Sequence, residues 1–329
     1  MRKPDFDNLL KVLNREVPDR PTLFEFFLNI PLYNKLTGKA AGTPITPQTV
    51  VDAFCAAGYD YANILAGYHF PRMERAHDKT VSMNEGAVIT DRESFEKLEW
   101  GEVEDFDYSE FDDLKIPDGM KLTGYGPGGV EENVISLVGY DNLCMMLYDD
   151  PDLVQQIVDN VGSRLVKHYE RLSEINAIGA MISNDDWGFQ AQTMISPEDM
   201  RKYIIPWHKK IADTIHASGR PAILHSCGNL RLVMDDIIDV CKYDAKHSYE
   251  DKIQPVEDAY EEYHDRITLL GGIDLDFLCR KPIDVINKRC REMLERTSGR
   301  GGYALGSGNS IPEYVPDESY MAMISVINE

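Results

Sequence analysis

From Met120 onward, the chain alternates apolar runs of strand length with amphipathic stretches of helix length. Two earlier apolar runs, at residues 22–27 and 59–65, have the same character. Such alternation predicts parallel strands with right-handed crossovers, and roughly eight strands favour a closed barrel over an open sheet. We therefore expect a (β/α)8 TIM barrel that forms one domain over residues 1–329, with an N-terminal helix and an acidic excursion at about 82–118.

Polar and ionisable side chains follow the ends of the expected strands. In a barrel of this kind, the carboxyl ends of the strands and the loops after them carry the active site. The residues in these positions are Glu25, His69, Asp185, Asp186, His225, Cys227, His247, Glu250, Asp274 and Asn309. Their convergence on one face of the barrel indicates an enzyme.

A metal site is expected after the apolar run at 221–224. His225 and Cys227 are two residues apart, so their side chains share a face if the strand continues through Cys227. An imidazole and a thiol together suit zinc. Glu250 closes the next strand and is the expected third ligand, with an open position left for catalysis. A cysteine nucleophile with His225 as its base, and a purely structural pair, are the alternatives.

Five other strand-end residues have two possible uses each. Asp185 and Asp186 suit acid–base chemistry, but they also suit helix capping in a loop. Glu25 lies among aromatic residues, where a lone carboxylate is costly without partners. It therefore faces a pocket, or else it reaches solvent or an arginine. Tyr68 and Trp187 are expected as pocket walls, although core packing is the commoner fate of such side chains.

A glycine-rich turn at residues 126–130 precedes a helix and could hold an anion at the helix N-terminus. It lacks both the GxGxxG pattern and a P-loop lysine, so a plain tight turn is the favoured interpretation.

Charge and composition exclude several classes of partner. The formal net charge is −22, which disfavours binding to nucleic acid and to anionic membranes. No apolar run is long enough for a transmembrane helix, and the first residues lack the apolar segment of a signal peptide. The six cysteines are scattered without a disulfide spacing, so reduced thiols and a cytoplasmic location are expected.

Several motifs together resemble the uroporphyrinogen decarboxylase superfamily. They are Pro18–Pro21, Asp185–Gly188, His225–Asn229, Asp244–Lys252, Gly271–Asp274 and Gly302–Ser310, and the resemblance covers nearly the whole chain. It implies a (β/α)8 barrel. Within the superfamily, the His-x-Cys pair resembles the zinc motif of the cobalamin-dependent methyltransferases, such as methylcobalamin:coenzyme M methyltransferase and the methyl-donor:corrinoid enzymes.

Two departures from these relatives shape the expected function. True uroporphyrinogen decarboxylases hold substrate carboxylates with an arginine-rich N-terminal segment, whereas this chain has no arginine between Arg20 and Arg72. Coenzyme M enzymes supply a further zinc cysteine where this chain has Ser307. The resemblance therefore implies a zinc-assisted transfer of a methyl group from a small, O-methylated molecule to cobalamin or another corrinoid, carried by a corrinoid protein.

The resemblance also implies roles for individual residues. The expected metal ligands are His225, Cys227 and Glu250, and the expected catalytic residues are Asp185, Asp186 and His247. Gly271, Gly308 and Asn309 are expected at the cofactor, and Glu25, Tyr68, His69, Trp187 and Ser307 at the substrate. A metal-free decarboxylase and a non-catalytic binder of corrinoids or tetrapyrroles are the alternatives. The methyl donor, the choice between a corrinoid protein, a pterin and a thiol as acceptor, and the oligomeric state stay open.

Overall fold

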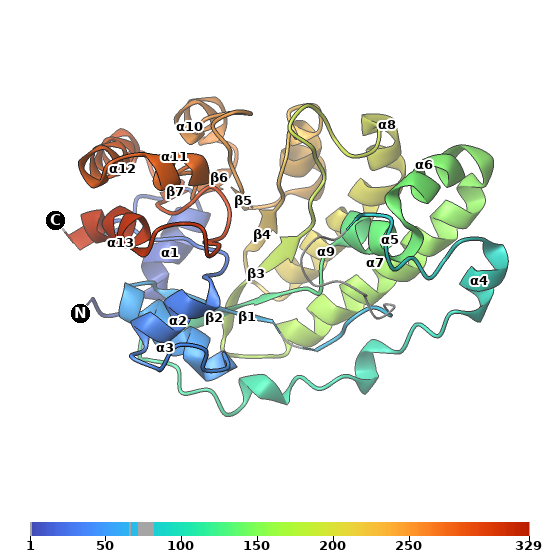
Figure 1. Cartoon of the computed structure of the whole chain (residues 1–329), viewed down its shortest axis with the longest axis horizontal. Helices are drawn as coiled ribbons and strands as arrows, with labels where there is room; N and C mark the ends of the chain where they lie inside the picture. Colours follow the sequence, from blue (N-terminus) through green and yellow to red (C-terminus); the bar gives the residue numbers. More distant parts are fainter. Residues whose placement is uncertain (1, 66, 72–81, 329) are drawn as a thin grey trace.

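The computed structural model describes residues 2–65, 67–71 and 82–328 (Figure 1). Within these ranges the chain forms a parallel sheet in which each strand pairs with the next in chain order. Its strands are β1 Tyr61–Leu65, β2 Lys121–Tyr125, β3 Ile178–Asn184, β4 Ala222–His225, β5 Ala245–His247, β6 Thr268–Leu270 and β7 Tyr303–Ala304. The unbroken parallel order and the helical crossovers agree with the predicted α/β, barrel-like architecture.

The segment at residues 22–25 lies beside β7. Leu23 forms a parallel bridge with Leu305, and the Phe24 N–H donates to the Leu305 carbonyl at 2.8 Å. Toward β1 the contact runs through a side chain, because the Glu25 N–H donates to the Tyr61 hydroxyl at 2.7 Å. That hydroxyl donates in turn to the Glu25 carbonyl at 2.6 Å. The strand expected at 22–27 is thus reduced to isolated bridges. On the side of β1, the Tyr61 hydroxyl takes the hydrogen bonds that a neighbouring strand's backbone would otherwise form.

Helices surround the sheet, and the two termini lie on the same side of the molecule (Figure 1). The α-helices are α1 Phe6–Leu13, α2 Ile30–Leu36, α3 Pro47–Ala57, α4 Arg92–Lys97, α5 Val130–Val138, α6 Tyr140–Asp149, α7 Pro151–Ser173, α8 Pro197–Asp199, α9 Ile205–Ala217, α10 Val256–Tyr263, α11 Leu275–Arg280, α12 Ile283–Thr297 and α13 Asp317–Ser325. Two π-helical segments, Met200–Ile204 and Asp236–Cys241, precede α9 and β5. Among the described residues, no helix is both long and apolar enough to cross a membrane.

The longest helix, α7, illustrates how the sequence forms the outer layer. The Asp150 side chain accepts a hydrogen bond from the Leu153 N–H, and Pro151 occupies the first turn. Apolar residues then recur at helical spacing and are buried: Leu153, Val154, Ile157, Val158, Val161, Leu165 and Leu172. Gly162 lets Trp207 of α9 pack closely, because a Cβ at this glycine would lie 2.1 Å from the indole ring.

The acidic excursion is anchored at several points. It contains α4 and two single-turn helices, Val103–Asp105 and Ser109–Phe111. Val103 and Phe111 are buried, and Lys167 of α7 forms ion pairs with Glu102 and Glu104. This connection runs along one side of the molecule from α4 to β2 (Figure 1). Its first residues, Ser82, Met83 and Glu85, line a cavity together with Asn184, which ends β3, and Asp186, which follows it.

Candidate metal centre

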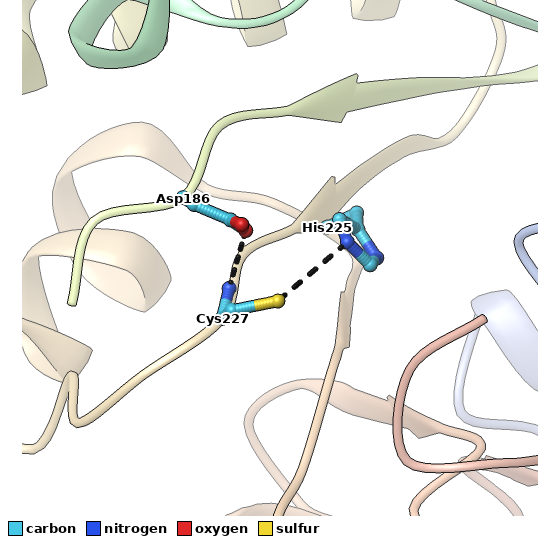
Figure 2. A group of neighbouring side chains, drawn as sticks. All are labelled: Asp186, His225 and Cys227. Atoms are coloured by element: carbon cyan, nitrogen blue, oxygen red, sulfur yellow. Dashed lines mark hydrogen bonds between the residues drawn. The ribbon is translucent and has the colours of Figure 1, made fainter. Parts of the chain in front are cut away.

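Three potential metal ligands converge at the carboxyl ends of β3 and β4. Ligand atoms of Asp186, His225 and Cys227 all lie within 4.8 Å of one another. Figure 2 shows the carboxylate above the Cys227 backbone, with the thiol directed toward the imidazole. Strand β4 ends at His225, so the condition that it continues through Cys227 is not met. Cys227 Sγ nevertheless lies 3.9 Å from His225 Nε2, and the chain turns after it at Gly228, whose φ is +88°.

Cys227 is surrounded by hydrogen-bond donors. Its N–H donates to Asp186 Oδ1 at 2.9 Å, which fixes the carboxylate beside the thiol. The Ser248 hydroxyl and the Asn309 amide donate to Cys227 Sγ at 3.4 and 3.2 Å. Burial, together with the charge of Asp186, raises the pKa of the Cys227 thiol. Donors aimed at sulfur and a nearby carboxylate suit a thiolate that shares a bound cation with that carboxylate.

Two buried histidines face each other behind the thiol. Nδ1 of His225 lies 2.7 Å from Nδ1 of His247, and Nε2 of His247 lies 3.2 Å from the Ser307 carbonyl oxygen. Burial lowers the pKa of His247 to about 3 and the pKa of His225 well below its ordinary value. Both rings are therefore neutral at pH 7. His247 is fully buried, so the proton transfer to a substrate that the sequence suggested for it finds no support in its position.

Ser307 forms two hydrogen bonds with the side chain of Glu25. The Ser307 hydroxyl donates to Glu25 Oε1 at 2.7 Å, and the Ser307 N–H donates to Oε2 at 3.2 Å. Both residues are fully buried. Burial raises the pKa of Glu25 to about 8, and the bonds from Ser307 oppose this rise only in part. Glu25 and Ser307 thus support the site from its inner side and do not line the cavity described below.

Two glycines permit the close approach of these elements. A Cβ at Gly271, whose φ is +68°, would lie 2.2 Å from the Ser307 carbonyl oxygen and 2.9 Å from His247 Nε2. A Cβ at Gly308 would lie 2.3 Å from the Tyr249 carbonyl oxygen. Any side chain at Gly271 would therefore push the Ser307 carbonyl and the His247 ring apart. The expected part of these glycines and Asn309 in cofactor binding stays a prediction.

Asp185 has a structural partner set that is unlike that of Asp186. Its two carboxylate oxygens accept the N–H groups of Glu131 and Glu132 at 2.9 and 2.8 Å, so it caps the N-terminus of α5. His208 Nε2 lies 2.8 Å from Asp185 Oδ2, and both side chains are buried. A Cβ at Gly129 would meet the Asp185 side chain at 2.0 Å. The Asp185 carboxylate therefore occupies the N-terminus of α5, after the glycine-rich turn, in the position where a phosphate would bind.

Glu250, the expected third ligand, lies outside the group of three. It is half-buried and lines a separate cavity of about 20 Å³, together with Lys246 and Ser248. Burial and the charges of Asp274 and Asp186 raise the pKa of Glu250. Lys246 is buried, its Nζ donates to the Ser248 carbonyl at 2.6 Å, and burial lowers its pKa to about 8. Lys246 therefore places a positive charge near Cys227 and Asp186. The carboxylate that lies beside the Cys227 thiol is that of Asp186 and not that of Glu250.

A cavity of about 990 Å³ opens beside Asp186. Most of its wall is apolar and aromatic: Phe26, Phe27, Leu65, Phe70, Met83, Ile135 and Met194. His69 also lines it, as the sequence suggested for a substrate contact. Tyr68 and Trp187 do not line it: they are buried in the core, where the Tyr68 hydroxyl donates to the Trp100 carbonyl and Trp187 packs edge-on against His208.

Two polar residues of this cavity escaped the sequence reasoning. Tyr125 ends β2 and Asn184 ends β3, and both line the wall. Burial raises the pKa of Tyr125 to about 12, so its phenol stays protonated. The Tyr125 ring packs edge-on against Phe26, and Phe26 stacks on His225 at 4.3 Å between ring centroids. Their positions at strand ends were the signal that could have identified them.

Comparisons with known proteins give a family and a fold. The family model described as "Uroporphyrinogen decarboxylase (URO-D)" matches residues 128–329. The uroporphyrinogen decarboxylases of Carboxydothermus hydrogenoformans and Geobacter sulfurreducens are 24% identical over 188 residues and 22% identical over 191 residues. These matches cover 56% and 57% of this chain and 50% and 52% of those proteins, so the chain spans about half the length of the curated relatives it matches.

One solved structure shares the fold over nearly its whole length. It is titled "methyltransferase from Methanosarcina mazei", and it superposes with a TM-score of 0.71 at 18% sequence identity. The superposition covers 98% of this chain and 97% of that one. The likeness establishes a common fold.

Proposed function

This chain belongs to the uroporphyrinogen decarboxylase (URO-D) family, and from that premise we propose that it is a zinc-dependent methyltransferase. The observation that carries the proposal is the group of Asp186, His225 and Cys227, whose ligand atoms lie within 4.8 Å of one another beside a large cavity. The Methanosarcina mazei protein of the same fold, titled a methyltransferase, supports it. The proposed reaction moves a methyl group from a small O-methylated molecule to a corrinoid held by a partner protein.

The donor set fits zinc. One thiol, one imidazole and one carboxylate oxygen are ligand types that this borderline metal accepts together. Three protein ligands leave a fourth position open, which is the arrangement of a catalytic zinc site. We propose Asp186 as the third ligand in place of Glu250, because its oxygen is fixed by the Cys227 N–H. A zinc ion held there would supply Lewis acidity toward the oxygen of a methyl ether.

The remaining chemistry falls to the residues of the cavity. Its aromatic and aliphatic wall binds the apolar body of the substrate and excludes water. We propose that the protonated Tyr125 phenol, which lines the cavity, donates a hydrogen bond and finally a proton to the ether oxygen from which the methyl group is removed. The Asn184 amide and His69 orient polar groups of the substrate. We also propose that residues 22–25 complete a (β/α)8 barrel, whose open end would receive the corrinoid protein.

The alternative is metal-free decarboxylation, and the decarboxylase names of the curated relatives support the decarboxylation. A multiply carboxylated substrate needs basic residues around it. Over the described residues, the cavity wall holds Glu85, Glu132 and Asp186 but neither arginine nor lysine. This charge pattern makes decarboxylation the weaker candidate.

Metal analysis and a methyl-transfer assay test the proposal together. Purified wild-type protein should hold zinc in a one-to-one ratio and should demethylate at least one compound of a methoxylated panel in the presence of free cob(I)alamin. The Cys227→Ala variant should lose both properties. Cys55→Ala, which changes a half-buried cysteine on α3, serves as the matched control and should keep both. Stoichiometric zinc that survives in Cys227→Ala, or release of CO₂ from a carboxylated substrate by metal-free protein, would contradict the proposal.

A further inference from the structure

We propose that His247 is a positioning residue, which holds His225 in the one tautomer whose Nε2 lone pair faces Asp186 and Cys227. The inference rests on the proposed metal site and adds a residue that makes no contact with the metal or the substrate. It assigns His247 a role different from the proton transfer that the sequence suggested.

The direction of each hydrogen bond fixes the tautomers. A carbonyl oxygen can only accept, so Nε2 of His247 carries the proton that it donates to Ser307 over 3.2 Å. A neutral imidazole has one N–H, so Nδ1 of His247 bears a lone pair. Nδ1 of His225 lies 2.7 Å from that lone pair and must donate its proton to it. The remaining nitrogen, Nε2 of His225, is then unprotonated and lies 3.9 Å from Cys227 Sγ.

The surroundings hold this chain of bonds in place. The two carboxyl oxygens of Glu25 form hydrogen bonds with the hydroxyl and the N–H of Ser307, which fixes the carbonyl that His247 uses. The absence of a side chain at Gly271 lets that carbonyl reach His247. On the other side, Phe26 stacks on the His225 ring with an interplanar angle of 29°, which restrains its rotation. An outer hydrogen-bond partner of this kind orients a metal-binding histidine and makes it a stronger ligand.

The competing arrangement is disfavoured by burial. If His247 were a cation, both of its nitrogens would donate, and His225 would carry its proton on Nε2, where a metal ligand needs a lone pair. A charged imidazole would then be fully buried without a carboxylate among its hydrogen-bond partners. Desolvation opposes that charge.

The tautomers can be read directly from metal-free protein. Long-range ¹H–¹⁵N spectra of histidine-labelled protein distinguish a protonated Nδ1 from a protonated Nε2. We expect His225 to be the Nδ1–H form and His247 the Nε2–H form. A spectrum in which His225 carries its proton on Nε2 overturns the inference. This measurement needs no metal, so it stands even if the wild-type protein binds no zinc, which would defeat the proposed function alone.

Zinc affinity tests the consequence of the arrangement. His247→Leu removes the acceptor and should weaken zinc binding by about 10- to 100-fold in competition with a chromogenic chelator. His247→Asn keeps an oxygen near the position of Nδ1, so it should recover most of that loss. The matched control is His168→Leu: His168 is equally buried and lies between the Tyr108 hydroxyl and the Tyr125 carbonyl.

The control separates positioning from general destabilisation. His168→Leu should lower the unfolding free energy much as His247→Leu does, but it should leave zinc affinity unchanged. Equal zinc affinity in His247→Leu and His168→Leu, or no recovery in His247→Asn, overturns the inference.

Discussion

Asp185 and Asp186 are neighbours with the same side chain, yet their environments give them different roles. Asp185 is buried against the first turn of α5 and His208, so its charge stabilises a helix. Asp186 is partly exposed, accepts the Cys227 N–H and lines the cavity. Burial raises the pKa of Asp186, and the hydrogen bonds from Cys227 and the charge of Lys246 oppose this rise only in part. The backbone turn after β3 decides which of the two can meet a ligand.

A pair of alanine variants separates the two aspartates. Asp185→Ala leaves two buried N–H groups and His208 without their acceptor, so it should lower the unfolding free energy by about 3 kcal/mol in urea titrations. Zinc affinity should change little. Asp186→Ala should cost at most about 1 kcal/mol of stability but should weaken zinc binding by more than roughly tenfold. Similar stability losses in the two variants, or intact zinc affinity in Asp186→Ala, would contradict these roles.

At this scale the sequence predicted the ligand types better than the full ligand set. His225 and Cys227 were identifiable because they are two residues apart after an apolar run. The choice between Asp186 and Glu250 depends on which loop bends toward the thiol, and no local pattern encodes that. Tyr68 and Trp187 were assigned to the pocket from their strand-end positions, but their large apolar surfaces drew them into the core.

Among the elements, the segment at residues 22–25 has the most unusual arrangement. It pairs with Leu305 beyond β7 through its backbone and with β1 through Tyr61 and Asn63, whose amide donates to the Glu25 carbonyl at 2.9 Å. It also places Glu25 fully inside the protein. Because burial raises the pKa of Glu25 from 4.5 to about 8, the folded protein holds this proton where the unfolded chain has released it.

Protein stability should therefore depend on pH through Glu25. Between about pH 5 and pH 8, stability falls as pH rises, and the effect levels off above about 8, where the folded protein also releases the proton. Glutamine does not titrate, so Glu25→Gln should not lose stability in this way. The unfolding free energy of the variant minus that of wild type should therefore rise by up to about 1.4 kcal/mol per pH unit between about pH 5 and pH 8. Urea unfolding at several pH values measures it. The control is Glu318→Gln, an exposed change on α13, whose unfolding free energy should differ from that of wild type by the same amount at every pH. A pH-independent difference for Glu25→Gln would contradict the prediction.

The order of elements was predictable because apolar runs and amphipathic helices alternate so regularly. Helices such as α3 and α7 lie where capping residues and apolar spacing placed them. Two strands differ from expectation for tertiary reasons. The one at 22–27 shrinks to bridges because the Tyr61 hydroxyl replaces a backbone partner. Strand β4 ends at His225, and the chain turns three residues later at Gly228.

In the whole molecule, the candidate ligands, His247, Asn309 and the cavity gather at the same ends of the parallel strands. The C-terminal face of such sheets is where loops can vary without disturbing the core. The formal charge of −22 accompanies a cavity wall whose charged side chains, over the described residues, are acidic. A bound divalent cation would offset part of this charge and would join the thiol to the carboxylate.

X-ray absorption at the zinc edge, measured on the full-length, metal-loaded protein, tests this central claim most directly. The Asp186, His225 and Cys227 site predicts a first shell with one sulfur and the remainder nitrogen and oxygen, and the sulfur contribution should vanish in Cys227→Ala. A shell of oxygen alone, or one with two or more sulfurs, would contradict the account.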